Sequence, residues 1–324
     1  MVFVEFSGLL VIIVLAAYLL SHGAEVLSDK WGTTIAGSLI LGLLTTLPEY
    51  TFVYWAAMKG HFDMAIGSAI GSCTLLVTLG YGLVILIATS KLSRRPVPMI
   101  RLTRATRIDA AFLLVTALVA LLFVWNDGAL SLTEGVLLAL VFVFYVIMVV
   151  RMSGKFEDDL LHVPHRRLFV ALAQLLIGGA AIFAVSEPFV DAMIHIAKAL
   201  GVSPVVIAIV LGPIASEMPE KITAYITVWR NGKLAQLSIC NFIGSKVNHN
   251  SLLLAIIPFV GYAKGHGKIP GLMSPMFLVM TIMTVAVSGM LARGRLQRWH
   301  GAVLVVCYAA IMILAMQTTD GGSR

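Results

Sequence analysis

Long apolar runs follow one another along this chain from its first residues to its last. They are roughly 20 residues long and continuous, whereas the strands of a membrane β-barrel would alternate apolar and polar residues. Because lipid offers backbone groups no hydrogen bonds, these runs are predicted to be helices. We expect about ten membrane spans. Their predicted limits are residues 6–27, 33–58, 63–90, 108–125, 130–150, 168–197, 203–229, 235–262, 270–292 and 299–317.

Basic residues concentrate in alternate loops between these spans. Of the 23 lysines and arginines, sixteen fall in loops on one side and five on the other, while Lys221 and Lys246 fall inside spans. The positive-inside rule places the richer side in the cytoplasm. We therefore expect a multi-pass protein of the cell membrane with both termini outside.

The composition agrees with a chain whose main solvent is lipid. Hydrophobic residues make up 59% and charged residues 12%, against about a quarter charged in soluble domains. The formal net charge of +7 is explained by the basic loops, so the expected partners are membrane lipid and inorganic cations, with no nucleic acid. The sequence carries no signal for an oligomeric state. The three cysteines lie in apolar stretches, which predicts neither a disulfide framework nor a metal motif.

One pattern of residues occurs in both halves of the chain. Each half contains a Pro-Glu pair in an apolar segment, ending at Glu49 and Glu220, and then an Ile-Gly-Ser sequence, ending at Ser72 and Ser245. The two glutamates are 171 residues apart and the two serines 173. Since each half has five predicted spans, the second half must enter the membrane from the opposite side.

This inverted repeat predicts a division of the chain and two broken helices. Residues 1–155 form an N-terminal five-helix repeat, 156–166 a cytoplasmic linker, and 167–324 a C-terminal five-helix repeat. Pro48 and Pro219 each remove a backbone donor and are expected to break their helices near the bilayer midplane.

At these residues the chain resembles the cation/calcium antiporter superfamily, which includes the sodium/calcium exchangers. The repeat of that family reads approximately G-T-S-x-P-E, followed by G-N-x-x-G-S-N-x-x-N. The resemblance covers both repeats and implies an all-α membrane protein of about ten helices in two inverted five-helix repeats. It also implies a transporter rather than an enzyme, whose ligand is a transported cation (Ca²⁺, Na⁺ or H⁺) and which has no covalently bound cofactor.

The resemblance further implies a central ion cluster built from both repeats. The residues that match the family motif are Thr45, Thr46, Glu49 and Ser72 in the first repeat, and Ser216, Glu220, Asn241 and Ser245 in the second. Glutamate inside a membrane costs about 2.5–3.5 kcal/mol even on lenient scales, so two at symmetric places favour a functional site. The alternative for the glutamates is an ion pair with Lys221 or Lys246. The alternative for each hydroxyl is a bond to its own preceding helical turn.

Several positions differ from the family motif. The residues that replace family asparagines or serines are Ser68, Cys73, Leu76, Glu217, Lys246 and His249. Calcium requires six to eight oxygen ligands, but Leu76 supplies none, His249 is a poor ligand for a hard cation, and Lys246 brings a competing positive charge. Lys246 is interpreted either as a tethered cation beside His249 or as part of a buried salt bridge. Glu217 either shares protons with Glu220 or neutralises Lys246.

Outside this cluster, acidic residues line one face of the first span and one face of the sixth, and each set can be interpreted in two ways. His22, Glu25 and Asp29 share a face of the first span, and Glu187 and Asp191 share one of the sixth. Each stripe either lines an ion path or forms a polar interfacial surface.

The leading functional hypothesis is a secondary active cation antiporter, similar to sodium/calcium exchangers, with alternating access at a midplane glutamate cluster. One alternative is a proton-coupled exchanger of another cation that lacks sodium sites. Another is a non-transporting membrane scaffold that has lost ion binding. A membrane enzyme is not supported, because the chain contains no HExxH motif and no nucleotide-binding loop.

Overall fold

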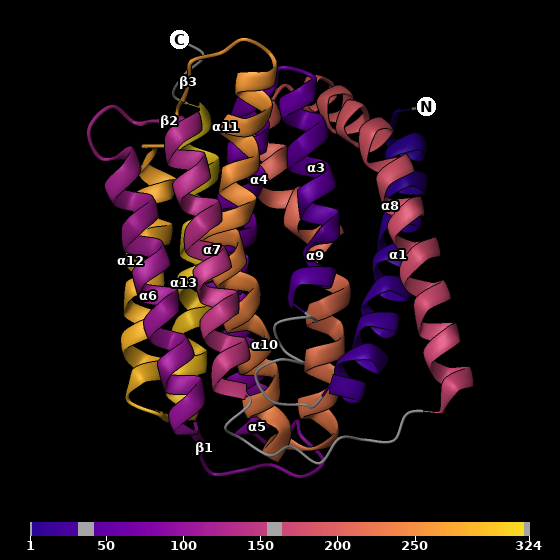
Figure 1. Cartoon of the computed structure of the whole chain (residues 1–324), viewed down its shortest axis with the longest axis vertical. Coiled ribbons are helices and arrows are strands. Elements are labelled where there is room, and N and C mark those ends of the chain that lie inside the picture. Colours follow the sequence, from indigo (N-terminus) through magenta and orange to yellow (C-terminus); the bar gives the residue numbers. More distant parts are fainter. Residues whose placement is uncertain (1, 32–41, 154–163, 321–324) are drawn as a thin grey trace.

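The computed structural model describes residues 2–31, 42–153 and 164–320, and these form a helical bundle (Figure 1). Residues 42–45 are also helical. The helices are α1 (Val2–Trp31), α3 (Leu47–Met58), α4 (Phe62–Leu75), α5 (Tyr81–Ala88), α6 (Arg104–Val124), α7 (Leu132–Ser153), α8 (His165–Leu200), α9 (Pro204–Arg230), α10 (Ala235–Asn248), α11 (Leu254–Ala263), α12 (Pro275–Ala292) and α13 (Arg298–Asp320). The shorter elements are η1 (Leu76–Gly80), η2 (Gly232–Leu234), η3 (His249–Leu253), β1 (Ile100–Arg101), β2 (Ala129–Ser131), β3 (Lys268–Pro270) and β4 (Arg295–Leu296).

The prediction of a multi-pass helical membrane protein is confirmed. Seven helices in the described part of the chain are long and apolar enough to cross a membrane. The predicted spans at 63–90 and 235–262 each form one continuous run of α- and π-helix, α4–η1–α5 and α10–η3–α11. The sixth span is longer than predicted, since α8 has 36 residues and extends for about 54 Å. The linker predicted at 156–166 lies largely outside the described residues.

Two small β-ribbons show how the halves are arranged. β1 of the first half pairs with β4 of the second, with Ile100 opposite Leu296. β2 of the first half pairs with β3 of the second, with Leu130 opposite Ile269. The two ribbons lie at opposite ends of the bundle, and both chain ends lie at the end that carries β2 and β3 (Figure 1). Each ribbon therefore contains one strand from each half, and the two ribbons lie at opposite ends of the bundle. This is the arrangement expected of an inverted repeat.

A pair of π-helical segments occupies equivalent positions in the two halves. η1 begins at Leu76 and η3 begins at His249, which are 173 residues apart, the same spacing as Ser72 and Ser245. π-Helical turns are rare and often mark functional sites. The repeat is therefore present in the local backbone as well as in the sequence.

Glycines let the helices of the two halves approach closely. A Cβ on Gly71 of α4 would lie 2.4 Å from the carbonyl oxygen of Ile209 on α9. A Cβ on Gly178 of α8 would lie 2.7 Å from the carbonyl oxygen of Ala16 on α1. Small residues are the usual means of close helix contact in membranes. α1 and α8 thus form a tight slanted pair along one side of the bundle (Figure 1).

The two prolines have different consequences for their helices. Helix 42–45 is interrupted at Thr46, and Pro48 lies in the first turn of α3, where a missing N–H costs little. In the second half, α9 is helical throughout from Pro204 to Arg230, so the predicted break at Pro219 is wrong. One lost backbone bond is tolerated here because α9 is packed against α1, α4 and α8.

Candidate cation-binding site

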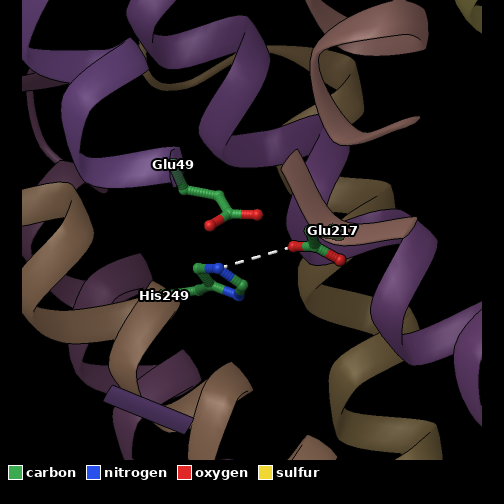
Figure 2. Close-up of side chains that lie close together, drawn as sticks. All are labelled: Glu49, Glu217 and His249. Carbon is green, nitrogen blue, oxygen red and sulfur yellow. Dashed lines mark ion pairs between the residues drawn. The ribbon is translucent and has the colours of Figure 1, made fainter. Parts of the chain in front are cut away.

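Three buried side chains from separate elements converge in the interior of the bundle. Glu49 comes from the first turn of α3, Glu217 from the middle of α9, and His249 from the start of η3 (Figure 2). One possible ligand atom from each lies within 4.8 Å of the others. Two carboxylates and an imidazole at this separation are a plausible ligand set for one divalent cation.

Glu217 is the best connected member of this cluster. Its Oε1 lies 3.4 Å from Nε2 of His249, and its Oε2 lies 2.7 Å from Nζ of Lys221 on the next turn of α9. The carboxylate therefore lies between a neutralising ammonium group and the imidazole of the candidate site. Its ion pair is made with Lys221 rather than with Lys246.

Glu49 is in the opposite situation. It is 1% exposed, and neither carboxylate oxygen makes a hydrogen bond of normal geometry with the described residues, although the hydroxyl of Ser216 lies nearby. The buried hydroxyl of Ser72 lies beside Glu217 and makes no other hydrogen bond among the described residues. Buried polar groups without partners are costly, and they are typical of a site that receives a ligand.

Glu220 does not join the cluster, although the sequence pairs it with Glu49. Its Oε1 accepts a 2.7 Å hydrogen bond from the side-chain amide of Asn241, and its Oε2 lies 4.0 Å from Nζ of Lys221. The residue equivalent to Asn241 in the first repeat is Ser68. The shorter serine leaves Glu49 without a corresponding amide partner, and Glu217 takes the place opposite Glu49 that symmetry would assign to Glu220.

Glu220 instead borders a small cavity of about 60 Å³. The cavity is lined by Ser21, Glu220, Thr223, Ala224, Thr227, Leu237, Ser238 and Asn241. Most of these residues follow Glu220 along α9 or face it from α10, toward the end of the bundle that carries β1 (Figure 1). The cavity thus adjoins the cluster on the side of the basic loops.

The predicted hydroxyl ligands are all buried, and most bond within their own helix. Thr46 Oγ1 donates to the carbonyl of Gly42 at 2.5 Å, and Ser216 Oγ donates to that of Gly212 at 3.0 Å. Thr45 Oγ1 also lies 3.5 Å from the Gly42 carbonyl. Ser245 is 1% exposed on α10, where its backbone packs against residue 42. These bonds match the alternative reading of hydroxyls that satisfy the preceding turn.

Lys246 belongs to a separate buried network. Its ammonium donates to Asn250 Oδ1 at 2.6 Å and to Met280 Sδ at 3.2 Å, and the Asn250 amide lies 3.4 Å from Thr116 Oγ1. No carboxylate among the described residues lies within ion-pair distance of Lys246. Its hydrogen bonds are thus made outside the cluster, although its charge still acts on Glu217 and His249 at longer range.

Two features of this region are not predicted by the sequence motifs. Lys221 contacts two glutamates, Glu217 and Glu220, rather than one. Tyr50, next to Glu49, donates a hydrogen bond to Asn248, next to His249, and so connects the two repeats. The position of Lys221, directly after a Pro-Glu pair inside a span, is the sequence signal that indicates its contacts with these glutamates.

The acidic stripe in α8 has a structural partner. Lys59, which follows α3, pairs with Asp191 at 2.9 Å and with Glu187 at 3.2 Å, and all three side chains are partly exposed. This supports the reading of a polar interfacial surface for that stripe. The side chains of Glu25 and Asp29 lie outside the described part of the chain.

The chain belongs to the sodium/calcium exchanger protein family, whose model matches residues 1–151 and 170–317. This confirms the resemblance seen in the sequence motifs. Members of this family are transporters, and the chain falls in the class of membrane cation/calcium exchangers.

Curated relatives and solved structures agree with this family. The chain is 25% identical over 320 residues to a putative antiporter CaxA of Alkalimonas amylolytica, covering 94% of this chain and 95% of that protein. It is 24% identical over 274 residues to an uncharacterized membrane protein of Methanocaldococcus jannaschii, covering 85% and 84%. The crystal structure of the H⁺/Ca²⁺ exchanger CAX superposes with a TM-score of 0.79 at 20% identity, over 99% of this chain and 87% of that one. The sodium-calcium exchanger NCX_Mj superposes with a TM-score of 0.70 at 21% identity, over 97% and 99%.

Proposed function

We propose that the protein is a secondary active antiporter that binds one divalent cation between Glu49, Glu217 and His249. The observation that carries this proposal is the buried convergence of these three side chains, with neither oxygen of Glu49 making a hydrogen bond of normal geometry with the described residues. A divalent cation would supply the missing interaction. Ser72, whose buried hydroxyl lies beside Glu217, would complete part of the coordination shell.

Alternating access would arise from the α1–α8 pair sliding over the rest of the bundle. This pair packs against α3 and α9, the two helices that carry Glu49 and Glu217. A polar contact joins the layers at Thr51 Oγ1 and Ser186 Oγ, 2.8 Å apart, and the apolar side chains Leu20 and Ile182 fill the α1–α8 interface. Movement of this layer would expose the cluster first to one side and then to the other.

We propose protons as the counter-ion. Two buried carboxylates so close together are stable only with a cation or a proton beside them. The first-repeat position that holds an asparagine in the family holds Leu76 here, and the second-repeat equivalent holds His249, so oxygen ligands suited to sodium are lost at both. Protons could replace the departing cation at Glu49 and Glu217 without any additional ligand.

A transition-metal substrate is the second candidate, and His249 favours it. Imidazole nitrogen suits Mn²⁺ or Zn²⁺, whereas calcium prefers oxygen ligands only. In this case the protein would exchange a transition-metal ion such as Mn²⁺ or Zn²⁺ rather than calcium.

The proposed location is the cell membrane, with the basic loops in the cytoplasm and both termini outside. The basic β1–β4 end and the end with the termini are opposite ends of the bundle (Figure 1). The positive-inside rule assigns the first of these ends to the cytoplasm.

The test is cation flux in proteoliposomes under an imposed pH gradient or sodium gradient. Wild-type protein should take up Ca²⁺ or Mn²⁺ when the pH gradient is applied, and Glu49→Gln and Glu217→Gln should each reduce flux at least about a hundredfold, a loss of roughly 2.7 kcal/mol. Glu134→Gln is the matched control, because Glu134, in the first turn of α7, accepts hydrogen bonds from Ser131 of β2, outside the site. Normal flux in both site variants would refute the proposed site, and flux driven by sodium alone would refute proton coupling.

A further inference from the structure

Lys221 is a fully buried lysine placed between two carboxylates. Its side chain is 0% exposed, and its Nζ lies 2.7 Å from Glu217 and 4.0 Å from Glu220. The ammonium also lies 5.0 Å from the centre of the Phe242 ring, a distance that permits a cation–π interaction. One cation therefore has two acidic partners, of which only Glu217 belongs to the candidate metal cluster.

Glu217 and Glu220 have different neighbours apart from Lys221. Glu220 already accepts the hydrogen bond from Asn241, while Glu217 faces His249 and the open carboxylate of Glu49. A divalent cation on Glu217 would repel an ammonium held 2.7 Å from the same carboxylate. Such charges attract or repel by several kcal/mol at an effective dielectric constant near 20. The flexible four-carbon stem of lysine allows the group to turn toward Glu220.

We propose that Lys221 is a tethered cation that occupies Glu217 when no substrate is bound and moves to Glu220 when a divalent cation enters. This inference rests on the proposed function of the cluster. The ammonium of Lys221 would compete with the divalent cation for Glu217. The negative charge of Glu217 would therefore be neutralised whether or not the substrate is bound.

The same residue sets the charge of the cation that the site accepts. Glu49, Glu217 and Glu220 together with Lys221 carry a formal charge of −2, which one divalent cation neutralises. This count covers groups in direct ion-pair or cluster contact; Lys246 acts on Glu217 only at longer range, because its ammonium donates to Asn250 and Met280. Without Lys221 the group would carry −3, enough for a divalent and a monovalent cation together. Lys221 thus takes the place that a co-bound sodium ion would otherwise fill.

Binding measurements on Lys221→Met test this inference. With purified protein in detergent, titration calorimetry with Mn²⁺ and with Ca²⁺ should give a Kd at least about tenfold lower than wild type for the metal that wild type binds, a change of roughly 1.4 kcal/mol. Adding sodium should tighten divalent binding in Lys221→Met and not in wild type. Lys246→Met is the matched comparison, since it removes another fully buried lysine that has no carboxylate partner among the described residues. It should not show the sodium effect.

A second variant covers the case in which Lys221→Met does not fold. Glu220→Gln keeps the shape of the side chain and removes the second position for the ammonium, so the divalent Kd should rise about tenfold although Glu220 is not a ligand. An unchanged Kd in Glu220→Gln, or unchanged or weaker binding in folded Lys221→Met, would overturn the tethered-cation role. The proposed function fails separately, if wild type binds neither metal or if Glu49→Gln binds as tightly as wild type.

Discussion

Asn241 donates a 2.7 Å hydrogen bond to Glu220, and the equivalent Ser68 of the first repeat makes no corresponding bond to Glu49. This one difference separates two glutamates that the sequence places in equivalent positions. Glu220 is held at the edge of the cluster, and Glu49 remains available within it.

Replacing Asn241 by the serine of the first repeat tests this relationship. Asn241→Ser should lower the free energy of unfolding by about 1–3 kcal/mol, because a buried carboxylate loses its partner. Thermal unfolding in detergent would measure the change, with the loop variant Asn231→Ser as control. Unaltered stability in Asn241→Ser would mean that the hydrogen bond does not hold Glu220.

Replacing His249 by the residue at the equivalent position, Leu76, tests the imidazole as a ligand. His249→Leu should weaken Mn²⁺ binding by about 10–100-fold, the range seen when even an outer partner of a metal ligand is removed. Calcium binding should weaken less, since calcium gains little from a nitrogen ligand. His195→Leu changes an exposed histidine of α8 and serves as the control. Equal losses for both metals would argue against selection by the imidazole.

The close approach of α4 and α9 can be tested at Gly71. The Cβ of Gly71→Ala would collide with the backbone of Ile209 and should destabilise the protein by about 1–3 kcal/mol. Gly289→Ala in α12 is the matched control, because its Cβ would meet no atom within 4 Å, and it should be neutral or stabilising by up to about 1 kcal/mol. The melting temperature should fall in Gly71→Ala and should stay unchanged or rise in Gly289→Ala. A Gly71→Ala protein as stable as wild type would show that the helices can separate without cost.

The β2–β3 ribbon should respond to acid through Asp127, which lies outside the membrane spans. The ammonium of Lys268 donates a hydrogen bond to Asp127 and lowers the pKa of this carboxyl below its ordinary value of 3.8. The stabilisation is therefore present above the unfolded pKa, near pH 4, and is lost as the pH falls through the lower folded value.

Hydrogen exchange provides the measurement for this ribbon. Protection of the backbone amides of residues 129–131 and 268–269 should decrease below about pH 4 relative to the β1–β4 ribbon, which serves as the internal control. In Asp127→Asn, protection of this ribbon should already be reduced at pH 7, and it should decrease less on acidification than in wild type. Identical pH profiles for the two proteins would contradict the assigned ion pair.

Much of the fold could be predicted from the pattern of apolar residues. Spans of about 20 residues are required by the bilayer thickness, and the odd number of spans per half requires inversion. The β-ribbons and the paired π-helices then confirmed this symmetry. The prediction failed at Pro219, because whether a proline interrupts a helix depends on the packing around it.

The sequence by itself determined that Glu49, Glu217, Glu220, Lys221 and His249 lie inside spans, where ionisable groups must find partners or ligands. Only the tertiary structure decided how they are divided. Glu217 joins Glu49 and His249, while Asn241 holds Glu220 and Lys221 lies between the two acids of α9. The physical reason is that sequence spacing assigns residues to a helix and a depth. The direction of each side chain depends on hydrogen bonds and ion pairs formed across helices that are distant in the chain.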